Sequence, residues 1–222
     1  MPKKDCRILI CCEESGIVSK AFRERGFTAW SNDIIETSGD APEFHLQMDC
    51  FEAIELINPT LLIGHPPCTY LTVTANKWLK DQEPRKSGAL VGEARREARR
   101  EAIIFFMKLY NSDIKYIALE NPIGCMSSVF RKPDQIIHPY YFGDNVRKAT
   151  CLWLKNLPKI IHSKENFVEP DVYHFKNGKG SCDKSYMVAL SQKDNRAKIR
   201  SVTYPGIANA FADQFGSYLL AQ

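Results

Sequence analysis

The chain has 222 residues, of which 44% are hydrophobic and 25% charged, and its formal net charge is +4. This composition excludes a collagen, a disordered tail and a low-complexity protein, and a chain of this length buries a core without disulfide staples. No apolar run approaches the roughly 20 residues of a membrane helix, and Met1-Pro2-Lys3-Lys4 does not begin a signal peptide, so we expect a soluble, cytoplasmic, globular protein.

The first half of the chain alternates short apolar runs with helical patterns. The apolar runs predict buried strands, at residues 7–12, 27–33, 61–64 and 116–119. Apolar residues at helical spacing predict a helix that starts at Ile17 and stops at Gly26, and a longer helix from Glu93 to Tyr110. Strands that alternate with helices predict a mostly parallel α/β sheet flanked by helices.

From Pro133 onward, prolines, aromatic residues and basic residues dominate the sequence. Two β-prone runs lie at 150–154 and 186–190, and a helix is predicted from Ile207 to Leu220. Large apolar side chains recur along this helix at steps of four residues, which is enough to dock it on the sheet. Because the chain contains neither an internal repeat nor a clear linker, we predict one domain over residues 1–222.

The net charge is concentrated in two segments. Residues 84–100 carry six Lys or Arg against two Glu, and residues 176–200 carry seven against two Asp. Such segments suit phosphate contacts with a nucleic acid, although a solvated surface explains the charge equally well. The cations that we single out for nucleic-acid binding are Arg85, Lys86, Arg95, Arg96, Arg99, Arg147, Lys148, Arg196 and Arg200.

Polar or reactive residues follow several of the predicted strands, and in parallel sheets the ligands bind beyond these strand ends. Gly16 opens the first helix, whose N-terminal amides suit an anion or a carboxylate, although a structural turn explains this glycine as well. Asp33 ends the second strand, where an acid can bind ribose hydroxyls or simply cap a helix. Asp49 is open to the same two interpretations.

Two further strand ends carry chemistry. In Pro66-Pro67-Cys68 the two prolines fix the backbone after a buried strand, which presents the thiol of Cys68 as a candidate nucleophile. In Glu120-Asn121-Pro122 the carboxyl group can donate or accept a proton in a polar pocket, or it can cap the next element. The eight cysteines contain no C-x-x-C pair and the five histidines are not at finger spacing, so we expect no metal.

At this point the sequence resembles the cytosine-5 DNA methyltransferase family, in the order of its motifs as well as in their content. The specific matches are the Pro-Cys loop, Leu62-Ile63-Gly64-His65-Pro66-Pro67-Cys68, and the Glu-Asn strand end, Tyr116-Ile117-Ala118-Leu119-Glu120-Asn121. Weaker matches are the glycine motif at Gly16–Gly26, Asn32-Asp33-Ile34, Met48-Asp49-Cys50, and Tyr204-Pro205-Gly206 with Asn209.

The resemblance implies a Rossmann-like fold of the S-adenosylmethionine-dependent methyltransferases, with residues 155–203 as a reduced recognition or insert region. It implies that Cys68 adds to C6 of a cytosine in DNA while Glu120 hydrogen-bonds N3, with Pro67 and Asn121 in the same catalytic set. The residues that it assigns to S-adenosylmethionine are Glu13, Ser15, Gly16, Asp33, Ile34, Asp49, Cys50, Pro66 and Asn209.

Three alternatives stay open. Gly64-His65-Pro66-Pro67-Cys68 is also similar to the Asp/Asn-Pro-Pro-aromatic loop of amino methyltransferases, with Tyr70 near the missing aromatic residue. The chain is also compatible with an inactive methyltransferase-like module that binds a nucleic acid or a protein through its basic segments. A free nucleotide or RNA in place of DNA is the third alternative, and the oligomeric state is left open.

Overall fold

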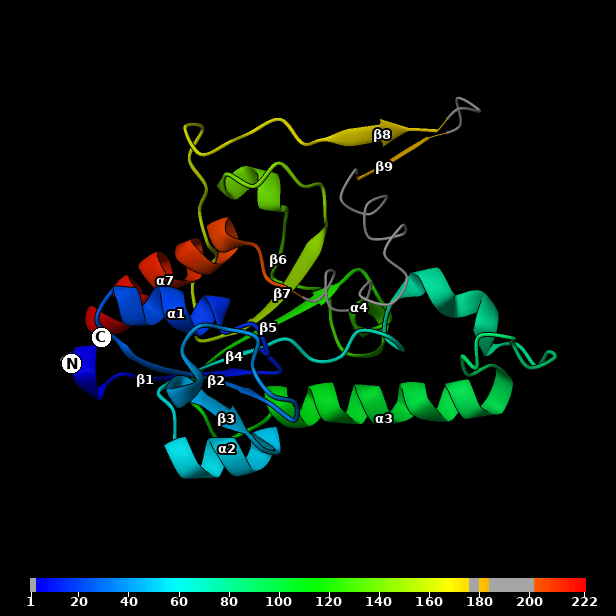
Figure 1. Cartoon of the computed structure of the whole chain (residues 1–222), viewed down its shortest axis with the longest axis horizontal. Helices are drawn as coiled ribbons and strands as arrows, with labels where there is room; N and C mark the ends of the chain where they lie inside the picture. Colours follow the sequence, from blue (N-terminus) through cyan, green and yellow to red (C-terminus); the bar gives the residue numbers. More distant parts are fainter. Residues whose placement is uncertain (1–2, 176–179, 184–201) are drawn as a thin grey trace.

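The computed structural model describes residues 3–175, 180–183 and 202–222, and its centre is a seven-stranded sheet (Figure 1). The strands are β1 (Arg7–Cys11), β2 (Thr28–Asp33), β3 (His45–Gln47), β4 (Leu61–Gly64), β5 (Tyr116–Pro122), β6 (Gln135–Ile137) and β7 (Thr150–Lys155). Their order across the sheet is β3-β2-β1-β4-β5-β7-β6. The first five run parallel, whereas β7 is antiparallel to both β5 and β6.

Helices cover both faces of this sheet. The α-helices are α1 (Ile17–Glu24), α2 (Cys50–Ile57), α3 (Gly92–Tyr110), the short α4 (Met126–Val129) and α7 (Pro205–Leu220). The 3-10 turns are η1 (Lys3–Asp5), η2 (Pro42–Phe44), η3 (Val73–Leu79) and η4 (Pro139–Phe142), and β8 (Val172–His174) pairs with β9 (Ser181–Asp183) in a separate hairpin.

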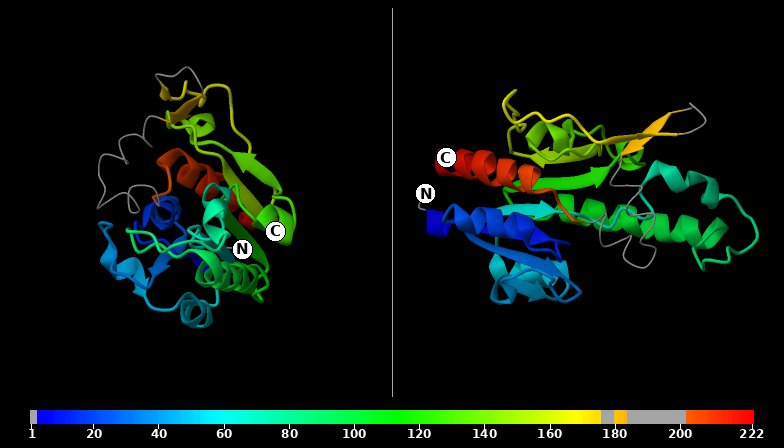
Figure 2. Two further views of the ribbon diagram at one scale, coloured as in Figure 1. Left: turned by 90° about the vertical axis from the view of Figure 1, so that its right-hand side faces the viewer. Right: turned by 45° about the horizontal axis from the view of Figure 1, so that its top comes forward.

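The strands are apolar on both faces because both faces are buried. On β1, Ile8 and Ile10 point into a core shared with α1 and α7, while Leu9 and Cys11 point into a core shared with α2 and α3. Figures 1 and 2 show the same division, with α1 and α7 side by side on one face and α2 and α3 on the other. The near-continuous apolar runs read from the sequence follow from this two-sided burial.

The predicted strands at 7–12, 27–33, 61–64, 116–119 and 150–154 are all present, and so are the three predicted helices. The sequence did not lead us to predict the short elements α2, α4, β3, β6, β8 and β9. The predicted strand at 186–190 and most of the basic segment 176–200 lie outside the described residues. Within the part of the chain that is described, no helix is long and apolar enough to cross a membrane.

Candidate active site

The pairing of β4 with β5 brings the two most specific sequence motifs together. These strands are parallel neighbours with Gly64 opposite Leu119, so the residues that follow them leave the sheet side by side. The Pro-Pro-Cys segment that ends at Cys68 and the Glu-Asn pair that begins at Glu120 therefore lie at the same edge of the sheet. This is the edge at which doubly wound folds bind their ligands.

His65 and Glu120 form a hydrogen-bonded pair at this edge. Nδ1 of His65 lies 2.9 Å from Oε2 of Glu120, and their side chains are only 9% and 17% exposed. Burial raises the pKa of Glu120, but the hydrogen bond from His65 and the charge of Lys148 more than offset it, so the pKa lies below its ordinary value. Glu120 is therefore an ionised carboxylate at neutral pH.

Cys68 is exposed at the start of a tight turn. Its carbonyl oxygen accepts hydrogen bonds from the amides of Leu71 and Thr72 at 3.0 and 3.1 Å. The turn also lies against the segment after β5, because the carbonyl of Leu71 accepts from the amide of Cys125 at 2.8 Å. A Cβ at Gly124 would lie 2.3 Å from that carbonyl oxygen, so this close approach requires glycine. Pro66 is buried beneath the turn, and Pro67 is exposed beside Cys68.

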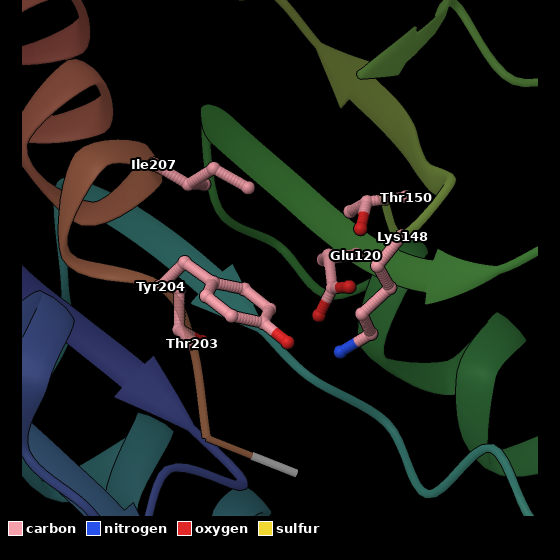
Figure 3. A pocket seen from close by; sticks show the side chains of 6 residues that line it. All are labelled: Glu120, Lys148, Thr150, Thr203, Tyr204 and Ile207. Carbon is pink, nitrogen blue, oxygen red and sulfur yellow. The ribbon is translucent and has the colours of Figure 1, made fainter. Parts of the chain in front are cut away.

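A small cavity opens beside the Glu120 carboxylate (Figure 3). Besides Glu120, its lining residues are Lys148, Thr150, Thr203, Tyr204 and Ile207. The carboxylate of Glu120, the ammonium group of Lys148 and the hydroxyl of Tyr204 all point into the same space (Figure 3). The cavity is small. The centre of a water molecule can move within about 10 Å³, so the cavity holds about one water molecule.

Two arginines of α3 hold the Cys68 turn from below. Arg95 is 4% exposed and donates to the carbonyl of Thr69 at 3.1 Å. Arg99 donates to the carbonyl of Tyr70 at 2.7 Å, and at 3.5 Å to that of Thr72. Both arginines were predicted to contact a nucleic acid. In the structure, Arg95 and Arg99 instead donate hydrogen bonds to main-chain carbonyls of the turn. Buried as it is, Arg95 has no access to a phosphate.

The other predicted phosphate contacts of this region differ in their surroundings. Arg96 donates to the carbonyl of Leu79 at 2.7 Å and forms ion pairs with Asp81 and Glu93. The Arg85 guanidinium lies over the ring of Trp78, 3.9 Å from its centroid, and Lys86 is exposed. Of this group, Arg85 and Lys86 remain the predicted contacts that face solvent.

Two further predicted cations, Arg147 and Lys148, precede β7 on the other side of the site. The backbone amide of Arg147 donates to Asp183 at 2.6 Å, and its guanidinium donates to Ser181 at 3.0 Å, so Arg147 ties β9 to the site. Lys148 lines the cavity beside Glu120. Arg196 and Arg200 lie outside the described residues.

The N-terminus of α1 is occupied by a carboxylate of the protein itself. Glu13 is 3% exposed, and its oxygens accept from the amides of Val18 and Ser19 at 2.5 and 3.2 Å. Burial raises the pKa of Glu13, and the charge of His65 and these hydrogen bonds only partly offset it. The amides at the start of α1 therefore do hold a carboxylate, but it belongs to the protein itself, so the amides of Val18 and Ser19 are not available to an external anion. Gly16 itself caps the helix at φ 67°, and Ser15 is half-buried beside it.

The ends of β2 and β3 carry the other residues predicted to hold the cofactor. Asp33 is half-buried and Ile34 is 74% exposed, side by side at the end of β2. Asp49 caps α2 by accepting from the amide of Phe51 at 2.8 Å. Cys50 is buried, and hydrogen bonds from neighbouring thiols, first that of Cys11, lower its pKa.

Asn209 lies in α7 and not at a strand end. It is exposed on α7 and lines a groove that also contains Ile17, Lys20 and Pro205. Among the described residues, no group of three or more His, Cys, Asp or Glu side chains is placed to hold a metal ion.

Sequence reasoning missed several residues of the site. No role was predicted for Thr150 and Thr203, which line the cavity, or for His65, which pairs with Glu120 outside that lining. For His65 a signal was present, because it is the first residue after a buried strand at the edge where ligands bind. For Thr150 and Thr203 no such signal exists, because the antiparallel β7 and the approach to α7 place them.

The strand order, the antiparallel β7 and the helices on both faces define the Rossmann-like fold of the S-adenosylmethionine-dependent methyltransferases. No family model matches the chain, and no curated protein matches it. Among solved structures, the chain is similar to the crystal structure of a mutant of Spodoptera frugiperda DNMT2, with 14% sequence identity and a TM-score of 0.41. The match covers 84% of this chain and 65% of that one.

Proposed function

We propose that this protein transfers a methyl group from S-adenosylmethionine to C5 of a cytosine in DNA, through a covalent adduct at Cys68. The observation that carries the proposal is the parallel pairing of β4 with β5, because it sets the Cys68 turn beside Glu120. The fold alone would leave the acceptor of the methyl group open. An exposed thiol and a buried carboxylate at the same end of the sheet favour a pyrimidine ring that must be activated by addition.

The chemistry needs both groups. C5 of cytosine is a poor nucleophile, so the Cys68 thiolate adds to C6 and the C5=C6 double bond becomes a carbanion-like centre at C5. This centre takes the methyl group, and loss of the C5 proton with departure of the thiolate then restores the double bond. Glu120 interacts with N3 of the ring while the thiolate is attached, which stabilises the negative charge that addition would otherwise leave there.

Residues that fit S-adenosylmethionine are present at the ends of β1 and β2. Asp33 offers a carboxylate for ribose hydroxyls, and the exposed Ile34 offers an apolar contact for the adenine. The carboxylate of the methionyl part needs donors other than the amides of Val18 and Ser19, because Glu13 already accepts from them. S-adenosylmethionine supplies the methyl group.

The substrate class rests on three cations, of which Lys86 is exposed and Arg85 and Lys148 are half-buried. Arg85 and Lys86 lie at the surface on the Cys68 side, and Lys148 lies beside Glu120. These charges support DNA as the substrate. A base in duplex DNA would have to be flipped out of the stack to reach Cys68, at a cost of a few kcal/mol.

The test incubates the protein and labelled S-adenosylmethionine with single- and double-stranded DNA that contains 5-fluorocytosine. Fluorine at C5 blocks the final loss of a proton, so the expected product is a covalent protein–DNA complex that mass spectrometry locates at Cys68. Cys68→Ser should abolish the complex. Cys182→Ser, at a half-buried thiol in β9, is the matched control and should leave it intact.

The same experiment separates the alternatives. An amino methyltransferase would label the DNA without any adduct and would keep its activity in Cys68→Ser. This alternative would need Tyr70 to stack on the base. The ring of Tyr70 already packs against Arg95, whose Cζ lies 5.1 Å from the ring centroid, so the contact gives the alternative little support. Absence of both adduct and label, together with no calorimetric binding of S-adenosylmethionine, would contradict both enzyme proposals and favour a binding module.

A further inference from the structure

We propose that His65 and Glu120 act as one acid pair, in which His65 positions the Glu120 carboxylate and supplies the proton that Glu120 delivers to a ring nitrogen of the bound base. This inference rests on the proposed function. It adds a positioning residue, His65, that the resemblance does not assign.

The contact between the two side chains is short and buried. Nδ1 of His65 is 2.9 Å from Oε2 of Glu120, and the His65 side chain is 9% exposed. The main chain fixes the histidine as well, because the His65 amide donates to the carbonyl of Cys11 at 3.0 Å. Both ends of the pair are therefore held by strands of the sheet, which is the precision that proton transfer needs.

The second ring nitrogen has no hydrogen-bond partner among the residues that the structure describes. Nε2 of His65 is fully buried in this state, and a buried polar atom without a partner costs about 1–3 kcal/mol. A purely structural histidine would normally have both nitrogens satisfied. This cost is tolerated where the group acts during turnover, which is consistent with a proton that is carried on the ring.

Charged and titratable groups from four elements surround the pair. From the β1–α1 turn, Glu13 is close enough for the charge of His65 to lower its pKa, and from β5 Glu120 accepts the hydrogen bond. On the far side of the carboxylate stand Lys148, before β7, and Tyr204, before α7 (Figure 3). His65 thus has two acids as neighbours, Glu13 and Glu120, and Glu120 has His65 and Lys148 as neighbours.

The pair explains how an ionised Glu120 can still protonate N3. An ionised carboxylate has no proton to give to N3, and its pKa is held below the ordinary value. When the thiolate adds to C6 and N3 becomes basic, the Nδ1 proton of the imidazolium first moves to Glu120, and Glu120 then passes this proton to N3 and is a carboxylate again. His65 is then neutral and N3 protonated, and the reverse transfer accompanies elimination of the thiolate.

The test uses two variants and two measurements. His65→Asn keeps a donor for the carboxylate but carries no titratable proton, whereas His65→Phe removes both. Adduct formation with 5-fluorocytosine DNA is followed against pH, and the ionisation of Glu120 is followed by carboxyl ¹³C NMR, its signal identified by its absence in Glu120→Gln. His162→Asn, at an exposed histidine that stacks on Tyr141, is the matched control.

Both variants should form adduct at least about 100-fold more slowly, the usual effect of losing a general acid, and should lose the decline of the rate at alkaline pH. The pKa of Glu120 should rise in His65→Phe and stay low in His65→Asn. Wild-type rate and pH profile in His65→Asn would overturn the proton supply, and an unchanged Glu120 titration in His65→Phe would overturn the positioning. If the wild type forms no adduct at all, the proposed function fails, while the NMR titration still decides whether the pair exists.

Discussion

The side-chain amide of Asn121 donates a hydrogen bond of 2.7 Å to the carbonyl oxygen of Pro66. The bond joins the end of β5 to the segment that carries Cys68, one residue beyond the contact between His65 and Glu120 on each strand. Asn121 is 2% exposed, so water does not replace this bond if it is lost. The geometry of the candidate site therefore depends on a residue that need not touch a substrate.

Replacement of Asn121 by Ala should destabilise the protein and impair the site together. The carbonyl of Pro66 would be left unpaired, at a cost of about 1–3 kcal/mol in the free energy of unfolding. Urea denaturation measures this loss, and the adduct assay measures the effect on Cys68. Asn111→Ala, at the exposed end of α3, should stay within about 0.5 kcal/mol of the wild type, and an equal effect of the two variants would contradict this role of Asn121.

Arg99 and Arg100 are neighbours on α3 with different partners, which makes them a matched pair. Arg99 donates to carbonyls of the Cys68 turn, whereas Arg100 pairs with Glu93 and Glu97 on the exposed face of its own helix. In Arg99→Gln the amides of Leu71 and Thr72 should exchange hydrogen faster, and unfolding should cost about 1–3 kcal/mol less.

Arg100→Gln should change neither quantity measurably, because exposed ion pairs contribute little to stability. Hydrogen exchange followed by mass spectrometry compares the two variants in the segment 69–76. If Arg99→Gln left the exchange of this segment at the wild-type rate, the arginine would not restrain the turn.

The buried Glu13 predicts a specific pH dependence of stability. Its folded-state pKa is raised above the ordinary 4.5, mainly by burial, so its neutral form stabilises the fold below that value. This contribution is lost as the pH rises through the folded-state pKa. Glu13→Gln stays neutral, so the stability advantage of the wild type over this variant should be largest in acid and should shrink toward pH 7.

Urea denaturation at several pH values from about 4 to 7 measures this difference, with Glu24→Gln as the control on the exposed end of the same helix. An advantage of the wild type that grew toward neutral pH would show that the amides of α1 favour the ionised form more than burial disfavours it. Glu13→Ala should lose the cap as well, at about 1 kcal/mol.

Arg85 and Lys86 predict the salt dependence of DNA binding. Arg85→Ala together with Lys86→Ala should weaken binding to any DNA sequence and reduce the slope of log affinity against log salt by about 2, one phosphate contact for each charge. Arg96→Ala should leave the slope unchanged, because Arg96 is paired with Asp81 and Glu93. Fluorescence anisotropy with a labelled oligonucleotide at several salt concentrations measures both, and equal slopes in all variants would exclude residues 85–86 from the interface.

The strand ends could be predicted from the sequence, but their partners could not. The apolar run 61–64 and the prolines after it were enough to place Cys68 at a sheet edge, because both signals are local. The pairing of His65 with Glu120 joins residues 55 positions apart, and it depends on which strands are neighbours. No local pattern encodes that choice.

The burial of the α3 arginines could not be predicted from the sequence either. In the sequence Arg95 belongs to a basic run that suits either solvent or phosphate, and the helical period does not distinguish the two. In the structure its partner is a main-chain carbonyl 26 residues away, in a turn without regular secondary structure. The charge was read correctly from the sequence, and its burial was not.

Two of the helices that begin at the end of the sheet where the candidate site lies, α1 and α7, are already capped by an acid. Glu13 accepts from the first amides of α1, and Asp144 accepts at 2.8 Å from the amide of Gly206 in the first turn of α7. Each free helix start would offer about half a positive charge to a ligand, and each carboxylate more than cancels it. The dipoles of α1 and α7 therefore give a polyanion no help in reaching the site. Within the part of the chain that the structure describes, attraction depends on the side chains of Lys148, Arg85 and Lys86.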